Sequence, residues 1–153
     1  MPFTSQKEII DMEHNLLKNI KSPDDVKKLD DNQLPLLADE VRDVIISTVS
    51  ENGGHLASNL GAVELTIALH KVFNSPNDKI IWDVGHQAYT HKLPTGRYSG
   101  FSTLRKEGGI SGFVRPDESE HDSFYEGHAG VSVSQAAGVA AANAAKGSKN
   151  YAV

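Results

Sequence analysis

Lys79-Ile80-Ile81-Trp82-Asp83-Val84-Gly85-His86 is the stretch that decides the fold class predicted from this sequence. Its first six residues form a short, almost continuously apolar run after a turn, which is typical of a strand buried on both faces of a parallel sheet. Gly85-His86 then stands at the carboxyl end of that strand. In open α/β sheets, ligands bind at this edge. We therefore predict an α/β fold with a parallel sheet and a ligand site beside His86.

Two other glycine–histidine pairs, Gly54-His55 and Gly127-His128, stand where helices are expected to begin or end. A histidine beside glycine places a titratable, hydrogen-bonding ring next to backbone that a ligand can approach closely. One such histidine would more often make a structural hydrogen bond than bind a ligand. Three in one chain are hard to explain by packing, and we interpret them as parts of one site.

Helical periodicity is clear in the first half of the chain. From Leu34 apolar residues recur at helical spacing until Gly53, which predicts an amphipathic helix with a glycine at its C-terminal end. A second helix is expected from Ser58 or Asn59 to the turn at residues 74–77.

The second half mixes loop and helix signals. Glycine and proline are so frequent between residues 94 and 116 that only short helices fit, residues 101–106 being the best candidate, and we expect a functional loop region. Small residues from 131 to 146 predict a helix that neighbouring backbones can approach closely, capped by Gly147. Its N-terminal N–H groups and dipole favour an anion, so we predict a phosphate site at Gly127-His128-Ala129-Gly130.

The predicted domain organisation has two parts. Residues 1–33 are expected to form a helical arm, in which Ser22-Pro23-Asp24-Asp25 opens a short helix. Residues 34–153 are expected to form the first part of the parallel-sheet domain. Because residues 150–153 have the pattern of a strand that is not completed, we expect the chain to stop inside this domain, with exposed apolar edges that favour association.

Composition excludes several functions. The 153 residues are 39% hydrophobic and 23% charged, as in an ordinary globular domain. A net charge of −5 without a basic block argues against a nucleic-acid partner. The chain has no cysteine, so disulfides, thiolate metal sites and a cysteine nucleophile are excluded. No apolar run resembles a signal peptide or a membrane span, and we expect a soluble, cytoplasmic protein.

A family resemblance follows from the motifs. Asp83 to Tyr89, with Gly53 to Gly61 upstream and His121-Asp122 through Gly127-His128 downstream, resembles the N-terminal part of the 1-deoxy-D-xylulose-5-phosphate synthases, thiamine-diphosphate-dependent relatives of transketolase. The resemblance runs from about Leu16 to Val153. It implies a transketolase-like cofactor domain in a transferase that condenses pyruvate with glyceraldehyde 3-phosphate, with loss of carbon dioxide, for isoprenoid, thiamine and pyridoxal precursor synthesis.

The resemblance also implies roles for particular residues. His86 and the turn formed by Gly127, His128 and Ala129 would bind the cofactor, chiefly its diphosphate. His55 would be catalytic, facing the reacting carbons and moving protons or hydrogen-bonding the substrate. The family usually has serines directly after the last histidine, whereas Ala129 and Gly130 stand here, so backbone N–H groups and His128 would make the diphosphate contacts.

The family's Mg²⁺ ligands are expected beyond residue 153, so no metal ligand is assigned within this chain. By the same resemblance, the partners would be the remaining C-terminal part of the synthase and a second copy in a homodimer. We expect the isolated chain to bind the cofactor poorly and to be inactive.

Two alternatives belong to other classes. The chain could be a non-catalytic folded fragment or interaction module. It could also be a metal hydrolase, although its histidines lack helical ligand spacing; the candidate ligands are His55, His86, His91, His121 and His128, with Asp83 and Asp122.

Several conspicuous side chains have a plainer interpretation. We expect Trp82 and Tyr89 to pack, and His121 and Asp122 to satisfy each other in a loop. Asp83 is expected to cap its strand end or to orient His86. The arginines are expected to be solvated charges, namely Arg97, Arg105 and Arg115.

Overall fold

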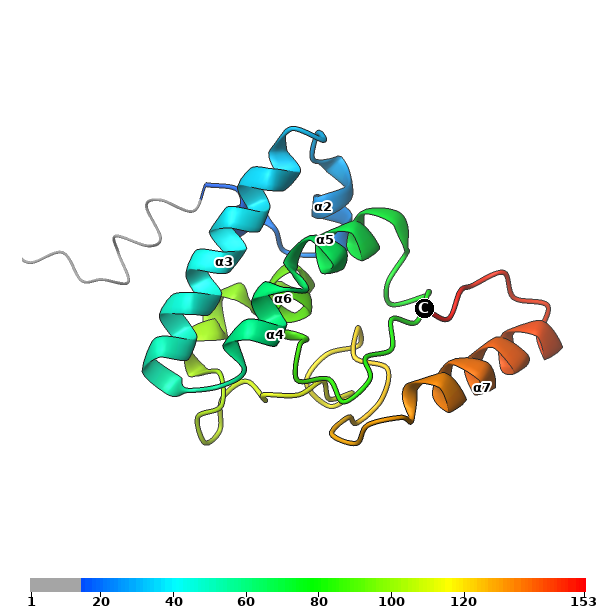
Figure 1. The fold of residues 1–153 in the computed structure, drawn as a ribbon. Coiled ribbons are helices and arrows are strands. Elements are labelled where there is room, and N and C mark those ends of the chain that lie inside the picture. Colours follow the sequence, from blue (N-terminus) through cyan, green and yellow to red (C-terminus); the bar gives the residue numbers. More distant parts are fainter. Residues whose placement is uncertain (1–14) are drawn as a thin grey trace, which may run out of the picture.

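The structure, a computed structural model, describes residues 15–153, and its regular elements are helical (Figure 1). In chain order they are η1 (Leu17–Asn19), α2 (Pro23–Lys28), α3 (Gln33–Asn52), α4 (Leu56–Leu60), α5 (Val63–Val72), α6 (Tyr89–Lys92), η2 (Leu93–Arg97), η3 (Tyr98–Thr103) and α7 (Ser132–Ala145). In this range, no helix is both long enough and apolar enough to cross a membrane.

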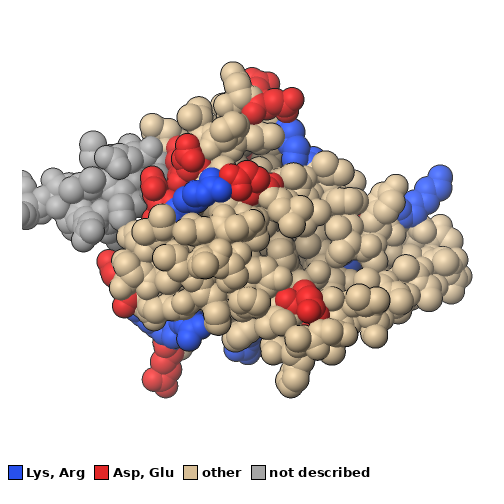
Figure 2. Space-filling view, viewed as in Figure 1, with Lys and Arg blue, Asp and Glu red and all other residues tan. Residues whose placement is uncertain are grey.

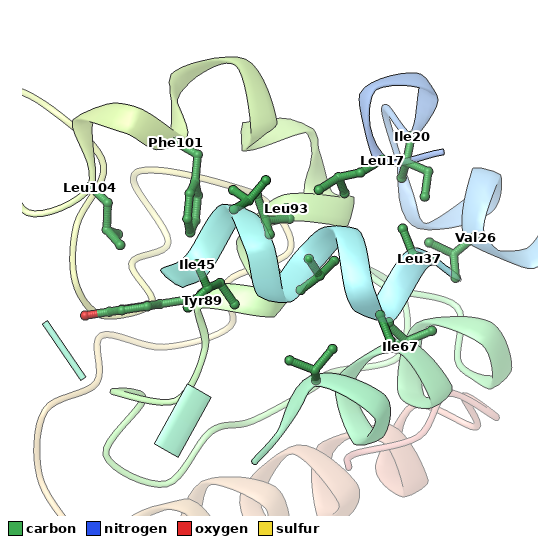
Figure 3. Close-up of a cluster of buried hydrophobic side chains, with 14 of the residues drawn as sticks. Leu17, Ile20, Val26, Leu37, Ile45, Ile67, Tyr89, Leu93, Phe101 and Leu104 are labelled. Atoms are coloured by element: carbon green, nitrogen blue, oxygen red, sulfur yellow. The ribbon is translucent and has the colours of Figure 1, made fainter. Parts of the chain in front are cut away.

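Helix α3 is the centre of the main core. Its apolar positions Leu37, Val41 and Ile45 are buried, and it ends at Gly53, whose φ of +72° lies in the left-handed region that favours glycine. Figure 3 shows side chains of the 93–104 segment on one side of α3 and Ile67 of α5 on the other. The helix predicted from Leu34 to Gly53 is therefore confirmed.

The segment before α3 packs into the same core. Leu17, Ile20 and Val26 are buried in the cluster that α3 centres, and α2 lies against α5. Helix α2 begins with the predicted signal: Ser22 and Asp25 form a capping box, and hydrogen bonds from Lys28 and the Lys21 backbone lower the pKa of the Asp25 carboxyl to about 2. The division into a 1–33 arm and a 34–153 domain stays a prediction, and residues 1–14 of that arm lie outside the described residues.

The predicted parallel sheet is not formed by residues 15–153. The two segments expected to be strands, residues 79–84 and 150–153, pair in parallel, but only through the single bridge between Lys79 and Ala152. Three backbone hydrogen bonds of 2.8–2.9 Å join them. The pairing cannot lengthen past residue 83, because Val84 and Gly85 turn the chain with φ values of +63° and +81°. A fully buried strand also needs a partner on each side, and each segment has one.

Two other predictions need correction. The helix expected from residue 58 to the turn at 74–77 is divided into α4 and α5 by Gly61 and Ala62. The short helix expected at 101–106 lies earlier, as the 3-10 helix η3.

Helix α7 forms where residues 131–146 predict it, but it does not pack closely against other backbone. It has no buried residue and extends away from the helical core (Figure 1). A Cβ atom added at Gly138 would meet nothing within 4 Å. On the face drawn in Figure 2, acidic and basic side chains are interspersed over the molecule.

Candidate functional site

The fold brings two of the three glycine–histidine turns into contact. His55 is the residue before α4, and His86 follows the left-handed turn at Gly85. Their imidazole rings lie edge to face, with centroids 5.0 Å apart and planes at 68°. Phe113, from the loop region of residues 94–116, adds an edge contact to His55 at 6.3 Å. These three aromatic rings thus meet although their residues are 27 to 58 positions apart in the sequence.

The Asn59 side chain joins the His55 turn to the His86 turn by hydrogen bonds. Its side-chain Nδ2 donates to the backbone carbonyl oxygens of His55, at 2.6 Å, and of His86, at 2.8 Å. Its Oδ1 accepts the backbone N–H of Tyr89 at 2.8 Å. The amide is completely buried, so each of these hydrogen bonds is shielded from competing water. Sequence reasoning placed Asn59 only as a possible helix start and missed this role.

Tyr89 and Gly54 set the position of the first turn. The Tyr89 hydroxyl lies 3.4 Å from the backbone nitrogen of His55. A Cβ atom at Gly54 would lie 2.8 Å from that hydroxyl oxygen, and Gly54 has a φ of +140°, which L side chains rarely adopt. Both space and backbone conformation therefore require glycine here. Tyr89 is buried, as is Trp82, so the packing role expected for both is confirmed.

The third turn lies beside the segment that carries His86. The Asp83 carboxylate accepts the backbone N–H groups of Gly130, at 2.8 Å, and of Ser132, at 3.4 Å. Asp83 therefore caps α7 rather than a strand end, and among residues 15–153 its carboxylate bonds these N–H groups and not His86. A Cβ atom added at Gly85 would lie 2.8 Å from Cβ of Glu126, which shows how closely the two segments approach.

The rest of the third turn is open to solvent. Gly127, His128 and Ala129 are exposed, and no acceptor in residues 15–153 takes their backbone N–H groups. A Cβ atom at Gly127 would meet nothing within 4 Å. The predicted anion site therefore keeps free donors at residues 127–129, whereas the N–H groups of Gly130 and of Ser132, the first residue of α7, already bind the Asp83 carboxylate.

The pKa values of three ionisable groups at the site shift for different reasons and not all in the same direction. Burial lowers the pKa of His55, and the neighbouring His86 and Arg105 add to that effect, so the ring is neutral at pH 7. Burial raises the pKa of the Asp83 carboxyl, but the N–H groups of Gly130 and Ser132 outweigh it and the net shift is downward. Burial raises the pKa of Glu126, and the Asp83 carboxylate reinforces the rise.

Several buried polar atoms around these turns have no hydrogen-bond partner among the described residues. They are Nδ1 of His86, Oε1 of Gln87 and Oε1 of Gln135, and the buried carboxyl of Glu126 faces the side chain of Gln135. Such atoms are rare in folded proteins, and each requires an explanation such as a bound water or ligand. Their concentration where residues 83–87 meet residues 126–135 marks this junction as the candidate site.

A buried charged network lies behind the site, and the sequence did not predict it. Arg97 donates to both oxygens of Asp122, each at 2.8 Å, and also to Glu118 at 2.7 Å. Lys92, fully buried, pairs with Glu118. The same two carboxylates accept the backbone N–H groups of Ser111 and Arg115, and so hold the loop that carries Phe113.

This network corrects two expectations. Arg97 is 9% exposed and ion-paired, not a solvated charge. Asp122 bonds His91 at 3.1 Å, whereas His121 bonds the hydroxyl of Ser75 at 2.9 Å, so His121 and Asp122 do not satisfy each other. No periodicity or spacing signals such pairs, because the partners are 21 to 46 residues apart.

The metal-hydrolase alternative lacks its site. Within residues 15–153, no group of three or more histidine, aspartate or glutamate side chains could hold a metal ion. His91 and Asp122 belong to the buried network, and Asp83 binds backbone N–H groups.

Known proteins match almost all of the described chain. The family model described as 1-deoxy-D-xylulose-5-phosphate synthase matches residues 17–153. The 1-deoxy-D-xylulose-5-phosphate synthase of Dictyoglomus turgidum is 63% identical over 134 residues, which cover 88% of this chain and 22% of the relative. The synthase of Pelotomaculum thermopropionicum is 60% identical over 134 residues, with 88% and 21% covered. The chain spans about a fifth of the length of these relatives.

These matches first define a class, because the matched N-terminal domain is that of a transketolase-like enzyme. They then define the family within it. The chain belongs to the 1-deoxy-D-xylulose-5-phosphate synthase family. The matched range includes all three glycine–histidine turns, so the family resemblance inferred from those motifs is confirmed.

Proposed function

We propose that this chain supplies part of the active site of a synthase that condenses pyruvate with glyceraldehyde 3-phosphate, with loss of carbon dioxide, to give 1-deoxy-D-xylulose 5-phosphate. The proposal rests on the family match together with one observation, the contact between the rings of His55 and His86. The product would serve isoprenoid and thiamine precursor synthesis. The cytoplasmic location expected from the sequence stays a prediction.

Thiamine diphosphate is the cofactor that the family implies, and the residues present fit its diphosphate. When bound, this cofactor supplies a carbanion that adds to carbonyl carbons. Within residues 15–153, Nδ1 of His86 is buried without a partner, and no acceptor takes the backbone N–H groups of Gly127, His128 and Ala129. These are donors of the kind that phosphate oxygens accept. We assign cofactor binding to these four residues.

His55 is the proposed catalytic residue. Its ring is exposed on one side and touches His86 on the other, and its lowered pKa leaves it neutral at pH 7. A neutral imidazole can accept a proton from a substrate hydroxyl or donate a hydrogen bond to a carbonyl oxygen. Contact between the His55 and His86 rings supports this assignment, because His86 is the residue proposed to bind the cofactor.

Magnesium, the rest of the synthase and a homodimeric partner complete the proposal. Mg²⁺ would be held by residues of the synthase beyond residue 153, where it would neutralise charge of the diphosphate. The described residues offer no metal cluster of their own.

Isothermal titration with thiamine diphosphate and Mg²⁺ tests the proposal, using the chain alone and mixed with the C-terminal polypeptide of the synthase. We expect binding and pyruvate decarboxylation in the mixture, and weak or no binding by the chain alone. Absence of both in the mixture would support the non-catalytic module instead and would contradict the roles of His55, His86 and His128.

A further inference from the structure

Asn59 hydrogen-bonds both histidine turns through one side chain. It lies in α4, four residues after His55, and its amide reaches across to the carbonyl of His86, 27 residues further along the chain. It has no exposed surface. A buried amide is costly unless its groups are paired, and here both nitrogen and oxygen are paired.

The surroundings allow one orientation of the amide. Two carbonyl oxygens face Nδ2, and one backbone N–H group, that of Tyr89, faces Oδ1. Reversing the amide would place its oxygen against two carbonyl oxygens and its nitrogen against a donor. The side chain therefore acts as a directional clamp: the two donors fix the carbonyls of His55 and His86, and the acceptor fixes the start of α6.

The distance between the His55 turn and the His86 turn depends on the hydrogen bonds of Asn59. No direct backbone hydrogen bond joins the His55 turn to the His86 turn among the described residues. The other links between the two turns are the ring contact itself and the long hydrogen bond between the Tyr89 hydroxyl and the His55 nitrogen. Tyr89 is itself held by Asn59 through its backbone.

We propose that Asn59 is a positioning residue that fixes the His55–His86 imidazole pair by hydrogen-bonding the carbonyl of each histidine. This inference rests on the proposed function for its catalytic meaning, since those two rings are assigned to the reaction and the cofactor. The clamp itself is a property of the chain without any ligand.

Asn52 provides a matched control. Its Nδ2 also donates to two backbone carbonyls, those of Ser102 at 3.0 Å and Leu104 at 2.9 Å, and it joins α3 to η3. Its hydrogen bonds go to neither histidine, although Asn52 lies three residues before His55. Replacing Asn52 and Asn59 by alanine therefore removes the same kind of bridge from two places, and only the Asn59 bridge joins the two histidine turns.

Nuclear Overhauser contacts between the ring protons of His55 and His86 give the test, measured on the labelled 153-residue chain without cofactor. We expect the contact in the wild type and in Asn52→Ala, and its loss in Asn59→Ala, even where the two variants have lost similar stability. Retention of the ring contact in folded Asn59→Ala would overturn the proposal. A merely structural asparagine would lower the melting temperature and leave the ring contact in place.

A second measurement needs no variant, in case Asn59→Ala does not fold. The side-chain NH₂ protons of Asn59, which is fully buried, should exchange with solvent at least about tenfold more slowly than those of Asn143, whose hydrogen bond to the carbonyl of Asn150 is exposed. Equal exchange rates for the Asn59 and Asn143 side chains would overturn the proposal that Asn59 holds the two turns.

The catalytic meaning is tested separately, in the mixture with the C-terminal polypeptide. Asn59→Ala should weaken cofactor binding by about tenfold or more, and Asn52→Ala by less than about twofold. If the wild-type mixture binds no cofactor, the proposed function fails. The ring-contact measurement still shows whether Asn59 fixes the His55–His86 pair. If the wild-type mixture binds cofactor and Asn59→Ala binds equally well, the positioning role fails.

Discussion

His70 and His91 stack inside the core, with ring centroids 5.0 Å apart and Nε2 of His70 lying 2.9 Å from Nδ1 of His91. The second nitrogen of His91 faces the Asp122 carboxylate at 3.1 Å, so that nitrogen carries a proton. Nδ1 of His91 then accepts the proton of His70 Nε2. This leaves Nδ1 of His70 buried without a partner, and both rings are neutral in the folded chain.

Stability should fall as the pH drops below about 6.5, the ordinary histidine pKa. Burial lowers the pKa of His70 far below that value, and burial lowers that of His91 although Asp122 opposes it. The unfolded chain therefore binds protons that the folded chain excludes, and the free energy of unfolding decreases with falling pH. His121 acts in the same direction. Above pH 7 these rings contribute no pH dependence.

Urea unfolding between pH 8 and pH 5 measures this effect. His70→Gln should have a shallower pH dependence than the wild type in that window, because one proton-binding site is lost from the unfolded chain. Carboxylates with lowered pKa, such as Asp25, act only below about pH 4 and do not confuse the result. If the unfolding free energy of His70→Gln depends on pH as steeply as that of the wild type, His70 is not a source of the pH dependence.

Removing Asp122 should be severely destabilising. Asp122→Ala leaves Arg97 without its paired carboxylate and His91 without an acceptor, so we expect a loss of about 3–5 kcal/mol in unfolding free energy. Asp117→Ala is the control, because the Asp117–Arg115 pair is about half exposed and should contribute little to stability. Similar losses in the two variants, measured by urea unfolding, would refute the importance of the buried network.

Alanine should have opposite effects at two glycines. Gly54→Ala places a Cβ atom against the Tyr89 hydroxyl in a strained backbone conformation, and should destabilise by about 1–3 kcal/mol. Gly138→Ala lies in the open middle of α7 and should stabilise by about 0.5–1 kcal/mol.

Thermal unfolding of the Gly54→Ala, Tyr89→Phe double variant checks the cause. Removing the hydroxyl relieves the contact, so the double variant should lose less stability than the sum of the single variants. Strict additivity would show that the backbone conformation alone requires the glycine.

Removing the Asp83 carboxylate should loosen the start of α7. In Asp83→Ala the N–H groups of Gly130 and Ser132 lose their acceptor, so the first turn of α7 should open more often. Faster hydrogen exchange at these two amides is the expected result, with Asp39→Ala, an exposed acidic residue on α3, as the control.

The same variant tests where an anion binds. If diphosphate uses the first N–H groups of α7, inorganic pyrophosphate should bind Asp83→Ala more tightly than the wild type, since a competing carboxylate has gone. Unchanged affinity would favour residues 127–129 and His86 as the only donors.

Local signals in the sequence predicted the helices well. The glycine at residue 53 and the capping residues of α2 act within one turn of helix, so their effect does not depend on the rest of the fold. The runs at residues 79–84 and 150–153 were each predicted to be strands, and the structure joins them by one parallel bridge. They could not indicate a sheet, because a sheet depends on partners on both sides of each strand.

The sequence by itself determined that three glycine–histidine turns exist and which family they belong to, because both are properties of residues in order along the chain. Only the tertiary structure decided that Asn59 joins His55 to His86, that Asp83 caps α7, and that Arg97 and Asp122 are buried together. These contacts join residues 25 to 47 positions apart, and hydrogen-bond donors and acceptors have no sequence periodicity that reveals a distant partner. The partner is chosen by burial, which leaves each polar group only the neighbours that the packed core brings within reach.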